Sequence, residues 1–171
     1  MTNLQTRNDG SQEGPTPPSS RYENRLHAFL GDQHCAGVSP TDTSFFSCRD
    51  LGSAFLATVT DEALGAVTSP ESSGARFRGA LFGLALDCSQ FRRDLIVDLS
   101  QVKYLNSESA FTLDDVNGFL TEKGRKLILT GVKGQPADKL ALSQQAIGVS
   151  GKLITLADSP EAALLLAEEG R

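Results

Sequence analysis

The chain has 171 residues, with 16 Lys or Arg against 21 Asp or Glu, so its formal net charge is −5. This length is typical of one domain, or of one domain with an appendage. The negative balance argues against a general binder of nucleic acid or of anionic membranes, because either would require a basic surface. Hydrophobic residues make up 39% of the chain, below the ~45–50% usual for a globular domain. Part of the chain is therefore expected to stay outside the core.

The low apolar content is concentrated in residues 1–42, which are rich in Asn, Gln, Ser, Pro and Gly. Such a segment buries too little apolar surface to offset the entropy lost on ordering, so we expect a flexible N-terminal tail. Within it, residues 21–31 are compatible with a short helix that carries Tyr22, Leu26 and Phe29 on one face. This helix is either transient or docks on the domain or on a partner.

The start of the chain lacks the basic segment and apolar run of a signal peptide, and no apolar run approaches the ~20 residues that span a membrane. The cysteines, Cys35, Cys48 and Cys88, are odd in number and widely spaced, which disfavours a disulfide framework or a zinc site. His27 and His34 both lie in the tail with a spacing that matches no metal site. We therefore predict a cytoplasmic protein with no metal, no other cofactor and no membrane insertion.

From residue 43 onward, the patterns predict alternating strands and helices. Strands are predicted at residues 44–48, 53–60, 94–99, 126–132 and 152–157. Helices are predicted from residue 69, at residues 107–123 and 136–147, and from residue 159. A hairpin followed by repeated strand–helix units implies an α/β fold with a mixed, mostly parallel sheet and helices packed against it. This domain is predicted to cover residues 43–171.

Local signals support several of these elements. The helices that start at Ser69 and Ser159 both read Ser-Pro-Glu, which combines an N-cap, a first-turn proline and a first-turn acid. Asp50 and Gly52 in the first connection predict a hairpin with a bulged turn. Gly124 is expected to end the helix at 107–123. Inward-facing apolar stripes are predicted on the first helix at Phe77, Leu81, Leu84 and Ala85, and on the second at Leu113, Val116 and Leu120.

The predicted domain is poor in catalytic residues. It contains no histidine, which removes the most common general base and the usual Ser–His and Cys–His nucleophile pairs. Residues 148–152 look faintly like a phosphate loop, but Leu153 stands where Ser or Thr is required, and a strand follows instead of a helix. Residues 131–134 follow a parallel strand, where open α/β sheets often bind ligands, although a plain turn explains them as well. Asp98 has no identifiable second carboxylate beside it. We predict no catalytic residue.

The most distinctive segment, DLIVDLSQVKYLNSES, runs from residue 94 to residue 109. It resembles the signature of the STAS domain family, the bacterial anti-sigma factor antagonists and their relatives. In that family, a buried strand ends in Asp-Leu-Ser-x-Val, and an aromatic and an aliphatic residue precede Asp-Ser-Ser/Thr-Gly at the start of a helix. The first part is matched by Asp98, Leu99, Ser100, Val102, Tyr104 and Leu105. Residues 124–132 and 159–163 resemble the family's next strand and closing helix, so the resemblance covers about residues 44–169.

The second part of the motif differs from the family pattern. In antagonists of this family, the second hydroxyl residue of Asp-Ser-Ser/Thr-Gly is phosphorylated by an anti-sigma kinase, and the phosphate breaks the complex with that kinase. This chain reads Asn106, Ser107, Glu108 and Ser109, so that Glu108 falls on the phosphoacceptor position. In the first turn of a helix, its charge is favoured by about 0.3–1 kcal/mol. It imitates in part a phosphate, which would carry roughly −1.5 to −2.

The resemblance implies a non-enzymatic regulator of transcription that acts by protein–protein contact, an anti-sigma factor antagonist with residues 106–109 in its binding surface. The implied partner is an anti-sigma factor of the serine kinase type, without direct contact to nucleic acid. Ser107 and Ser109 remain as hydroxyls that a kinase could modify, and Glu108 could equally be an ordinary first-turn residue. The alternatives are an accessory or scaffold subunit of a transporter ATPase or stress-sensing assembly, and, less favoured, a nucleotide-binding enzyme that uses the loop after Val132.

Overall fold

A computed structural model describes residues 45–60, 74–146 and 153–169. The predicted tail with its helix at 21–31, the helix start at Ser69, and the loop at 148–152 lie outside the described residues. In the described part, the elements follow the order β1-β2-α3-β3-α4-β4-α5-β5-α6. This order and the mostly parallel sheet confirm the predicted α/β fold class.

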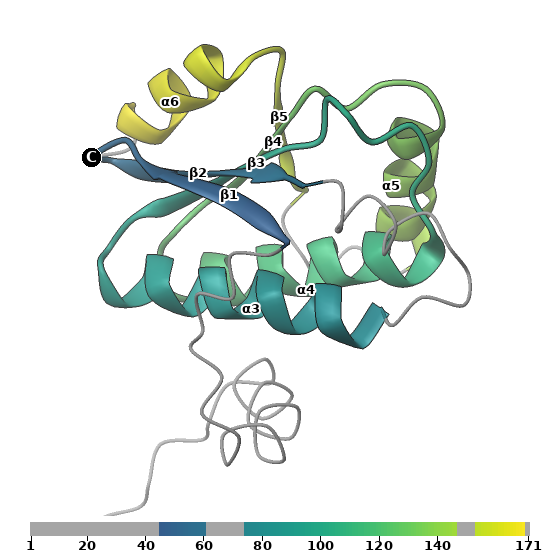
Figure 1. The fold of residues 1–171 in the computed structure, drawn as a ribbon, viewed down its shortest axis with the longest axis horizontal. Helices are drawn as coiled ribbons and strands as arrows, with labels where there is room; N and C mark the ends of the chain where they lie inside the picture. The colour runs from purple at the N-terminus through teal and green to yellow at the C-terminus, as the bar shows by residue number, and fades with distance from the viewer. Residues whose placement is uncertain (1–44, 61–73, 147–152, 170–171) are drawn as a thin grey trace, which may run out of the picture.

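The five strands form one sheet in which their spatial order is their chain order (Figure 1). β1 (Phe46–Asp50) and β2 (Ala54–Val59) pair in antiparallel fashion as a hairpin. β3 (Asp94–Asp98), β4 (Leu127–Thr130) and β5 (Thr155–Ala157) then add to β2 in parallel. The parallel strands all start at one edge of the molecule and end at the opposite edge. A crossover connection therefore has to return the chain to the first edge before each new parallel strand.

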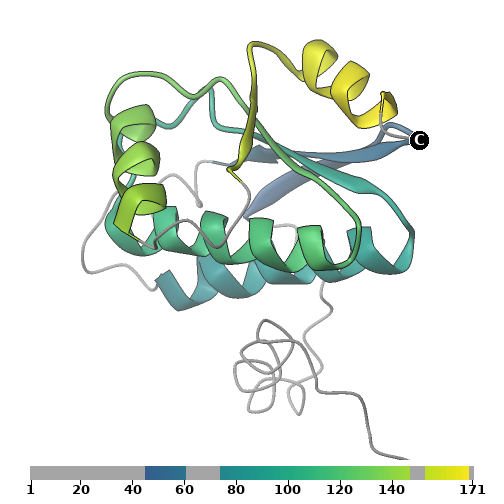
Figure 2. The ribbon, with the colours of Figure 1, turned by 180° about the vertical axis from the view of Figure 1, so that it is seen from behind.

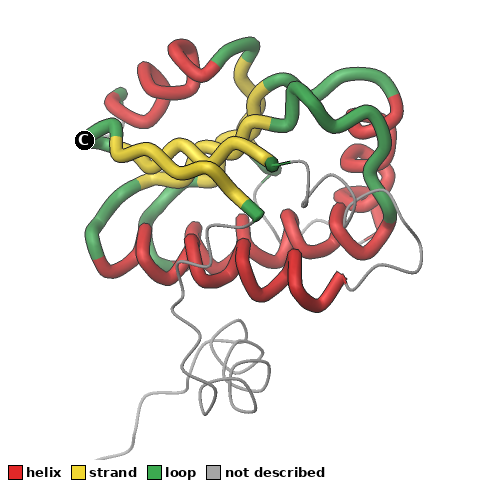
Figure 3. The backbone as a smooth tube through the Cα atoms, in the orientation of Figure 1, coloured by secondary structure: helices red, strands yellow, loops and turns green. Residues whose placement is uncertain are grey.

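Helices cover both faces of this sheet. Figure 3 shows the strands as a single layer between helices. α3 (Gly74–Gln90) and α4 (Ser107–Glu122) lie side by side on one face, and α6 (Pro160–Glu168) lies on the other (Figures 1 and 2). α5 (Gln135–Ala146) packs against α4 at the end of the molecule where the parallel strands finish. The loops that follow β3 and β4 therefore meet at the start of α4.

The core has two unequal parts. The larger part lies between the sheet and the α3–α4 pair, and it buries all seven apolar residues predicted to face inward on these helices. The smaller part lies under α6 and consists of Ala54, Leu56, Ile96, Ile128, Ala163 and Ala167. Because both faces of β3 are covered, Leu95, Ile96 and Val97 are fully buried. A continuous apolar run is the pattern expected of such a strand.

The prediction of a bulged turn between β1 and β2 is wrong. The register of the hairpin is unbroken along its length, and Leu51 N donates to Ala54 O (2.9 Å), which leaves a two-residue connection. Gly52, the first of these two residues, has φ +85°, and its N–H donates to the carboxylate of Asp50 (2.7 Å). Glycine at the first position suits a tight turn whose twist matches that of the strands, so no extra residue is needed.

The predicted helix signals are confirmed where the structure describes them. Ser159 Oγ accepts a hydrogen bond from Ala162 N (3.1 Å), and Pro160 stands in the first turn of α6. Gly124 ends α4 with φ +68°, the left-handed conformation that glycine adopts most readily. The last strand is shorter than predicted, since β5 begins only at Thr155.

The loops after β3 and β4 touch each other through Gly131. This residue follows β4 with φ +68°, and a Cβ atom on it would lie 2.6 Å from Ser100 Cα. Leu99 N also donates to Thr130 O (2.9 Å), so the backbones stay paired beyond the end of β3. Only glycine permits this approach, which places the loop after β3 relative to β4.

Gly131→Ala is expected to destabilise the protein much more than Gly134→Ala. Gly134 has φ +59° with open space around it, so alanine there adds only the left-handed strain of about 1–2 kcal/mol. At position 131 the same strain is joined by a backbone clash that requires the loop to move. Urea denaturation of both variants measures the difference, and equal losses of stability would contradict this account.

Candidate functional site

The loop after β3 is anchored by the residues that match the first half of the signature. Asp98 Oδ1 accepts a hydrogen bond from Ser100 N (2.9 Å), which closes a turn directly after the strand. Leu99, Val102 and Leu105 are buried in the larger core. These three apolar residues recur at every third position, and each side chain ties the loop to the core. This explains the spacing of the matched residues. Asp98 therefore has a structural role in the turn.

Asn106 is the N-cap of α4. Its side-chain oxygen accepts a hydrogen bond from Ser109 N (2.8 Å), and its backbone is extended, with φ −76° and ψ 165°. The structure thus assigns the cap to Asn106, and Ser107 is the first residue of α4. Asparagine and aspartate cap helices about equally well. Replacement of the family's aspartate therefore keeps the helix start.

Gln135 holds this loop from the first residue of α5. Leu105 N donates to Gln135 Oε1 (2.8 Å), and Gln135 Nε2 donates to Leu105 O (3.1 Å). One amide group thus pairs with both backbone groups of the residue before the N-cap. The sequence analysis missed Gln135, since no local pattern connects residues thirty positions apart.

The four motif residues meet at the start of α4 but differ in exposure. Ser107 and Glu108 are exposed in the first turn, whereas Ser109 is fully buried. Ser109 Oγ has no hydrogen-bond partner among the described residues. A kinase can therefore reach the hydroxyl of Ser107 in this conformation but not that of Ser109.

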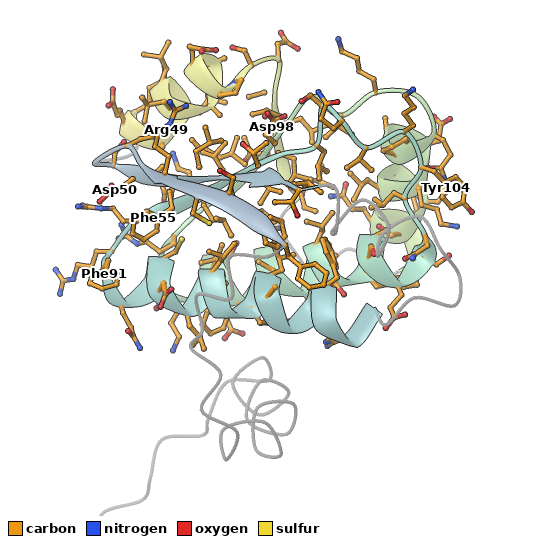
Figure 4. The ribbon with its side chains drawn as sticks, in the orientation of Figure 1. Arg49, Asp50, Phe55, Phe91, Asp98 and Tyr104 are labelled. Atoms are coloured by element: carbon orange, nitrogen blue, oxygen red, sulfur yellow. The ribbon has the colours of Figure 1, made fainter. Side chains whose placement is uncertain are left out.

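Two aromatic side chains are partly exposed close to the motif in sequence. Tyr104 lies two residues before the N-cap and is 48% exposed (Figure 4). Phe111 follows Glu108 by three residues, so both belong to the same side of α4, and its side chain is 41% exposed. Aromatic side chains are enriched at the surfaces through which proteins bind one another.

Acidic groups continue along α4. Burial raises the pKa of the Asp114 carboxyl, and the charge of neighbouring Asp115 raises it further. Asp115 itself forms an ion pair with Arg78 of α3 (3.0 Å), which ties the two helices together. The exposed beginning of α4 is thus presented by a helix that is held from α3, from α5 and from the core.

The described residues contain little that would support an enzyme. No three His, Cys, Asp or Glu side chains in residues 45–60, 74–146 and 153–169 come together as a metal ion would require. Ligands of open α/β sheets bind where the strand order reverses, and the described sheet has no such reversal. Gly131 packs on Ser100, which favours the plain turn for residues 131–134.

The described cysteines are not activated thiols. Cys48 and Cys88 are free, and burial, followed by the charge of Asp87, raises the pKa of both. The thiolate is the reactive form of cysteine, so a raised pKa disfavours nucleophilic chemistry. Cys35, His27 and His34 lie outside the described residues.

Comparison with known protein families agrees with the fold and with the anchored loop. The family model for the STAS domain matches residues 39–158. The chain belongs to the STAS domain family. The predicted resemblance is confirmed, and this STAS domain includes the whole sheet and the start of α4. None of its helices in the described ranges is long and apolar enough to cross a membrane.

Solved structures share the fold at low sequence identity. A serine-to-glutamate variant of RsbS from Moorella thermoacetica has a TM-score of 0.55 and 14% identity, covering 74% of this chain and 97% of that chain. A structure of the stressosome, titled a signal integration and transduction hub, has a TM-score of 0.50 and 17% identity, covering 72% of this chain and 96% of that chain. No curated protein sequence is significantly similar. At these identities the likeness shows the fold alone.

Asn106→Ala is expected to lower the free energy of unfolding by about 1 kcal/mol, because the N–H of Ser109 loses its acceptor. Asn106→Asp restores the cap and is expected to match the wild type within about 0.5 kcal/mol. Ser107→Ala serves as the control, since Ser107 does not cap the helix. Urea denaturation measures all three, and a loss at Ser107 comparable to that at Asn106 would contradict the assignment of the cap.

Gln135→Ala is expected to cost roughly 1–3 kcal/mol and to speed hydrogen exchange at the amide of Leu105, because both backbone groups of Leu105 lose their partner. Gln101→Ala removes an exposed glutamine from the same loop and is expected to change stability by less than about 0.5 kcal/mol. Hydrogen exchange followed by NMR distinguishes the two variants. Unchanged exchange at Leu105 in the Gln135 variant would show that the clamp is dispensable.

Proposed function

We propose that this STAS domain is a non-enzymatic regulator of the anti-sigma factor antagonist type, which binds its partner through the start of α4. The observation that carries the proposal is the exposure of Ser107 and Glu108 on a helix end held by the core and by Gln135. A binding surface that is ordered before binding loses less entropy when the complex forms.

The surroundings of Glu108 support a protein partner. Tyr104 and Phe111 provide partly exposed aromatic area on the two sides of the motif, and aromatic side chains are enriched among the residues that dominate binding energy. Glu108 adds a charge at the end of α4 where the backbone N–H groups of the helix favour an anion. The proposed partner is a cytoplasmic anti-sigma factor of the serine kinase type, with no direct contact to nucleic acid.

In this proposal, Glu108 fixes the surface in a phosphate-like state. A serine kinase transfers phosphate to a hydroxyl group, which Glu108 lacks, so position 108 has no reversible switch of this kind. The exposed hydroxyl of Ser107 remains available, whereas the buried hydroxyl of Ser109 does not. Reversible phosphorylation of Ser107 is therefore the alternative to the fixed state within this motif.

A second candidate function is a structural subunit of a stress-sensing assembly. The fold likeness to RsbS and to a stressosome structure favours this version over the transporter-ATPase version. A subunit of this kind needs the α4 surface for contact but needs no phosphoacceptor. Both candidates assign the chain a binding role rather than catalysis, and both use the domain proposed for residues 43–171.

Glu108→Ser is expected to bind a serine-kinase-type anti-sigma factor about tenfold more tightly than the wild type, because it removes a charge that mimics phosphate. Addition of ATP is expected to phosphorylate position 108 in this variant and to reverse the gain. Glu108→Gln separates the two effects, since it removes the charge without supplying a hydroxyl. Calorimetry measures the binding, and mass spectrometry locates the phosphate.

The matched control is Glu122→Ser, which removes an exposed carboxylate from the other end of α4 and is expected to leave binding unchanged. Phosphate on Ser107 of the wild type, removable by a phosphatase, would contradict the fixed state. Failure of wild type and variants to bind the kinase, together with migration of the native protein in a very large assembly, would favour the structural subunit.

A further inference from the structure

α3 lies in the outer layer of the molecule but carries few charges. Between Phe77 and Ser89 its charged residues are Arg78 and Asp87, and every residue in this range is buried or half-buried. A helix that packs one stripe on a sheet usually turns a charged side to solvent. The composition and burial of α3 are instead those of a helix contacted on both sides.

The outward sides of α3 and α4 form one surface. The two helices lie side by side with their apolar stripes on the same face of the sheet (Figures 1 and 2), so the sides opposite these stripes adjoin. A residue two positions from an inward-facing one lies about 200° around the helix. The residues with this spacing define what we call the outer helix face: Gly79, Gly83, Leu86, Phe111 and Gly118.

The outer helix face is apolar. Phe111 is 41% exposed, and Leu86 is half-buried against the larger core. The three glycines present no side chain, so an approaching segment meets Leu86 and Phe111 first.

The charged residues around this face are mainly acidic. Arg78 and Asp115 already pair with each other (3.0 Å), so a segment that covers them leaves neither charge without a partner. Glu108 stands in the first turn of α4, and Lys123 is its C-cap. The remaining charged residues within residues 77–89 and 111–122 are Asp87, Asp114 and Glu122. The surface therefore suits an apolar segment that carries positive charge.

Two of these carboxyl groups are already partly removed from water. Burial raises the pKa of Asp87, and burial followed by the charge of Asp115 raises the pKa of Asp114. A partly desolvated carboxylate is screened less than one in bulk water. A guanidinium group placed near either carboxylate is therefore favoured.

The N-terminal part of the chain enters the domain beside α3. Residues 1–44 precede the first described residue, and the ring of Phe46 packs on that of Phe77 in the first turn of α3, with the centroids 5.7 Å apart. Residues 32–44 span up to about 43 Å when extended, whereas α3, with 17 residues, is about 26 Å long. A segment that ends at Gly31 can therefore reach the whole outer helix face.

Residues 21–31, which lie outside the described residues, have the composition that suits this face. The helix predicted there carries its apolar residues on one side, and its two arginines, Arg21 and Arg25, exceed its single acidic residue. The segment precedes residues 39–158, which the STAS family model matches. It is thus an addition to the domain, with an apolar side to bury and a positive charge that complements the outer helix face.

We propose that residues 21–31 form a helix that docks on the outer helix face of the same chain. Its apolar side packs on Leu86 and Phe111, and its arginines lie near the carboxylates of Asp87 and Asp114. A short helix is marginal alone and gains its stability from such packing. Because the segment is tethered, its effective concentration is about millimolar, so a modest contact area is sufficient.

Other exposed leucines are less suited to hold this segment. Leu142 on α5, and Leu153 and Leu156 at β5, are each more than half exposed. β5 forms the edge of the sheet opposite to β1, where the tether begins. The position of the tether therefore favours the outer helix face, and Leu142 provides a control surface.

The docked segment and a partner at the start of α4 exclude each other at Phe111. This consequence rests on the proposed function, whereas the docking itself does not. Residues 21–31 thereby act as an internal competitor of the partner.

The test uses the full chain with tryptophan as the probe, because the chain has no tryptophan of its own. Phe29→Trp is expected to emit at a shorter wavelength than Leu4→Trp, the matched control elsewhere in the tail, because a docked ring leaves water. Phe111→Asp added to Phe29→Trp is expected to shift the emission to that of the control. Leu142→Asp added to Phe29→Trp is expected to leave the emission unchanged.

Equal emission from Phe29→Trp and Leu4→Trp would overturn the proposal. A red shift caused by Leu142→Asp but not by Phe111→Asp would also overturn it, because the segment would then lie on α5. A blue shift that disappears on dilution would place the segment on a second copy of the chain, against the proposed contact within one chain.

A second measurement leaves the domain itself unaltered. Leu26→Asp in the ¹⁵N-labelled chain removes an apolar contact from the segment, and it is expected to shift the amide signals of Gly79, Gly83 and Gly118. Leu4→Asp is the control and is expected to leave them in place. Glycine signals that do not respond to Leu26→Asp would contradict the docking. Both measurements are made without a partner, so the docking and the proposed function fail separately.

Discussion

Burial of β3 on both faces is the constraint on which the rest of the structure depends. A strand of this kind requires helices above and below the sheet, and α3 and α4 cover one face while α6 covers the other. Its parallel neighbours require crossover helices. The loops that follow the parallel strands therefore gather at one edge of the sheet, and the loops that precede them gather at the opposite edge. The α4 site lies at the edge where the parallel strands end.

The α4 site combines a rigid backbone with an altered motif. Asn106 preserves the cap, Gln135 fixes the preceding residue, and Gly131 allows the neighbouring loop to approach. These interactions act on the backbone and do not depend on the residue at position 108. The motif can therefore exchange a phosphoacceptor for glutamate without a change in the shape of the surface. In the proposed function, this exchange turns a reversible charge into a constant one.

The α4 start is stabilised by favourable local geometry, with a capped helix and satisfied backbone groups. The end of α3 has a left-handed arginine, Arg92, where the end of α4 has a left-handed glycine, Gly124. The Arg78–Asp115 ion pair links α3 to α4.

The sequence by itself determined the order of the elements, the buried stripes of α3 and α4, and the helix start at Ser159, because these depend on periodicity and on residues a few positions apart. It also located the motif at residues 106–109 through the family resemblance. It was wrong about the bulge at Gly52, where the tight turn depends on how the two strands pair. Only the tertiary structure decided the clamp from Gln135, the burial of Ser109 and the contact between Arg125 and Arg92. These are contacts between distant segments, and local patterns in a single sequence do not encode which distant residues meet.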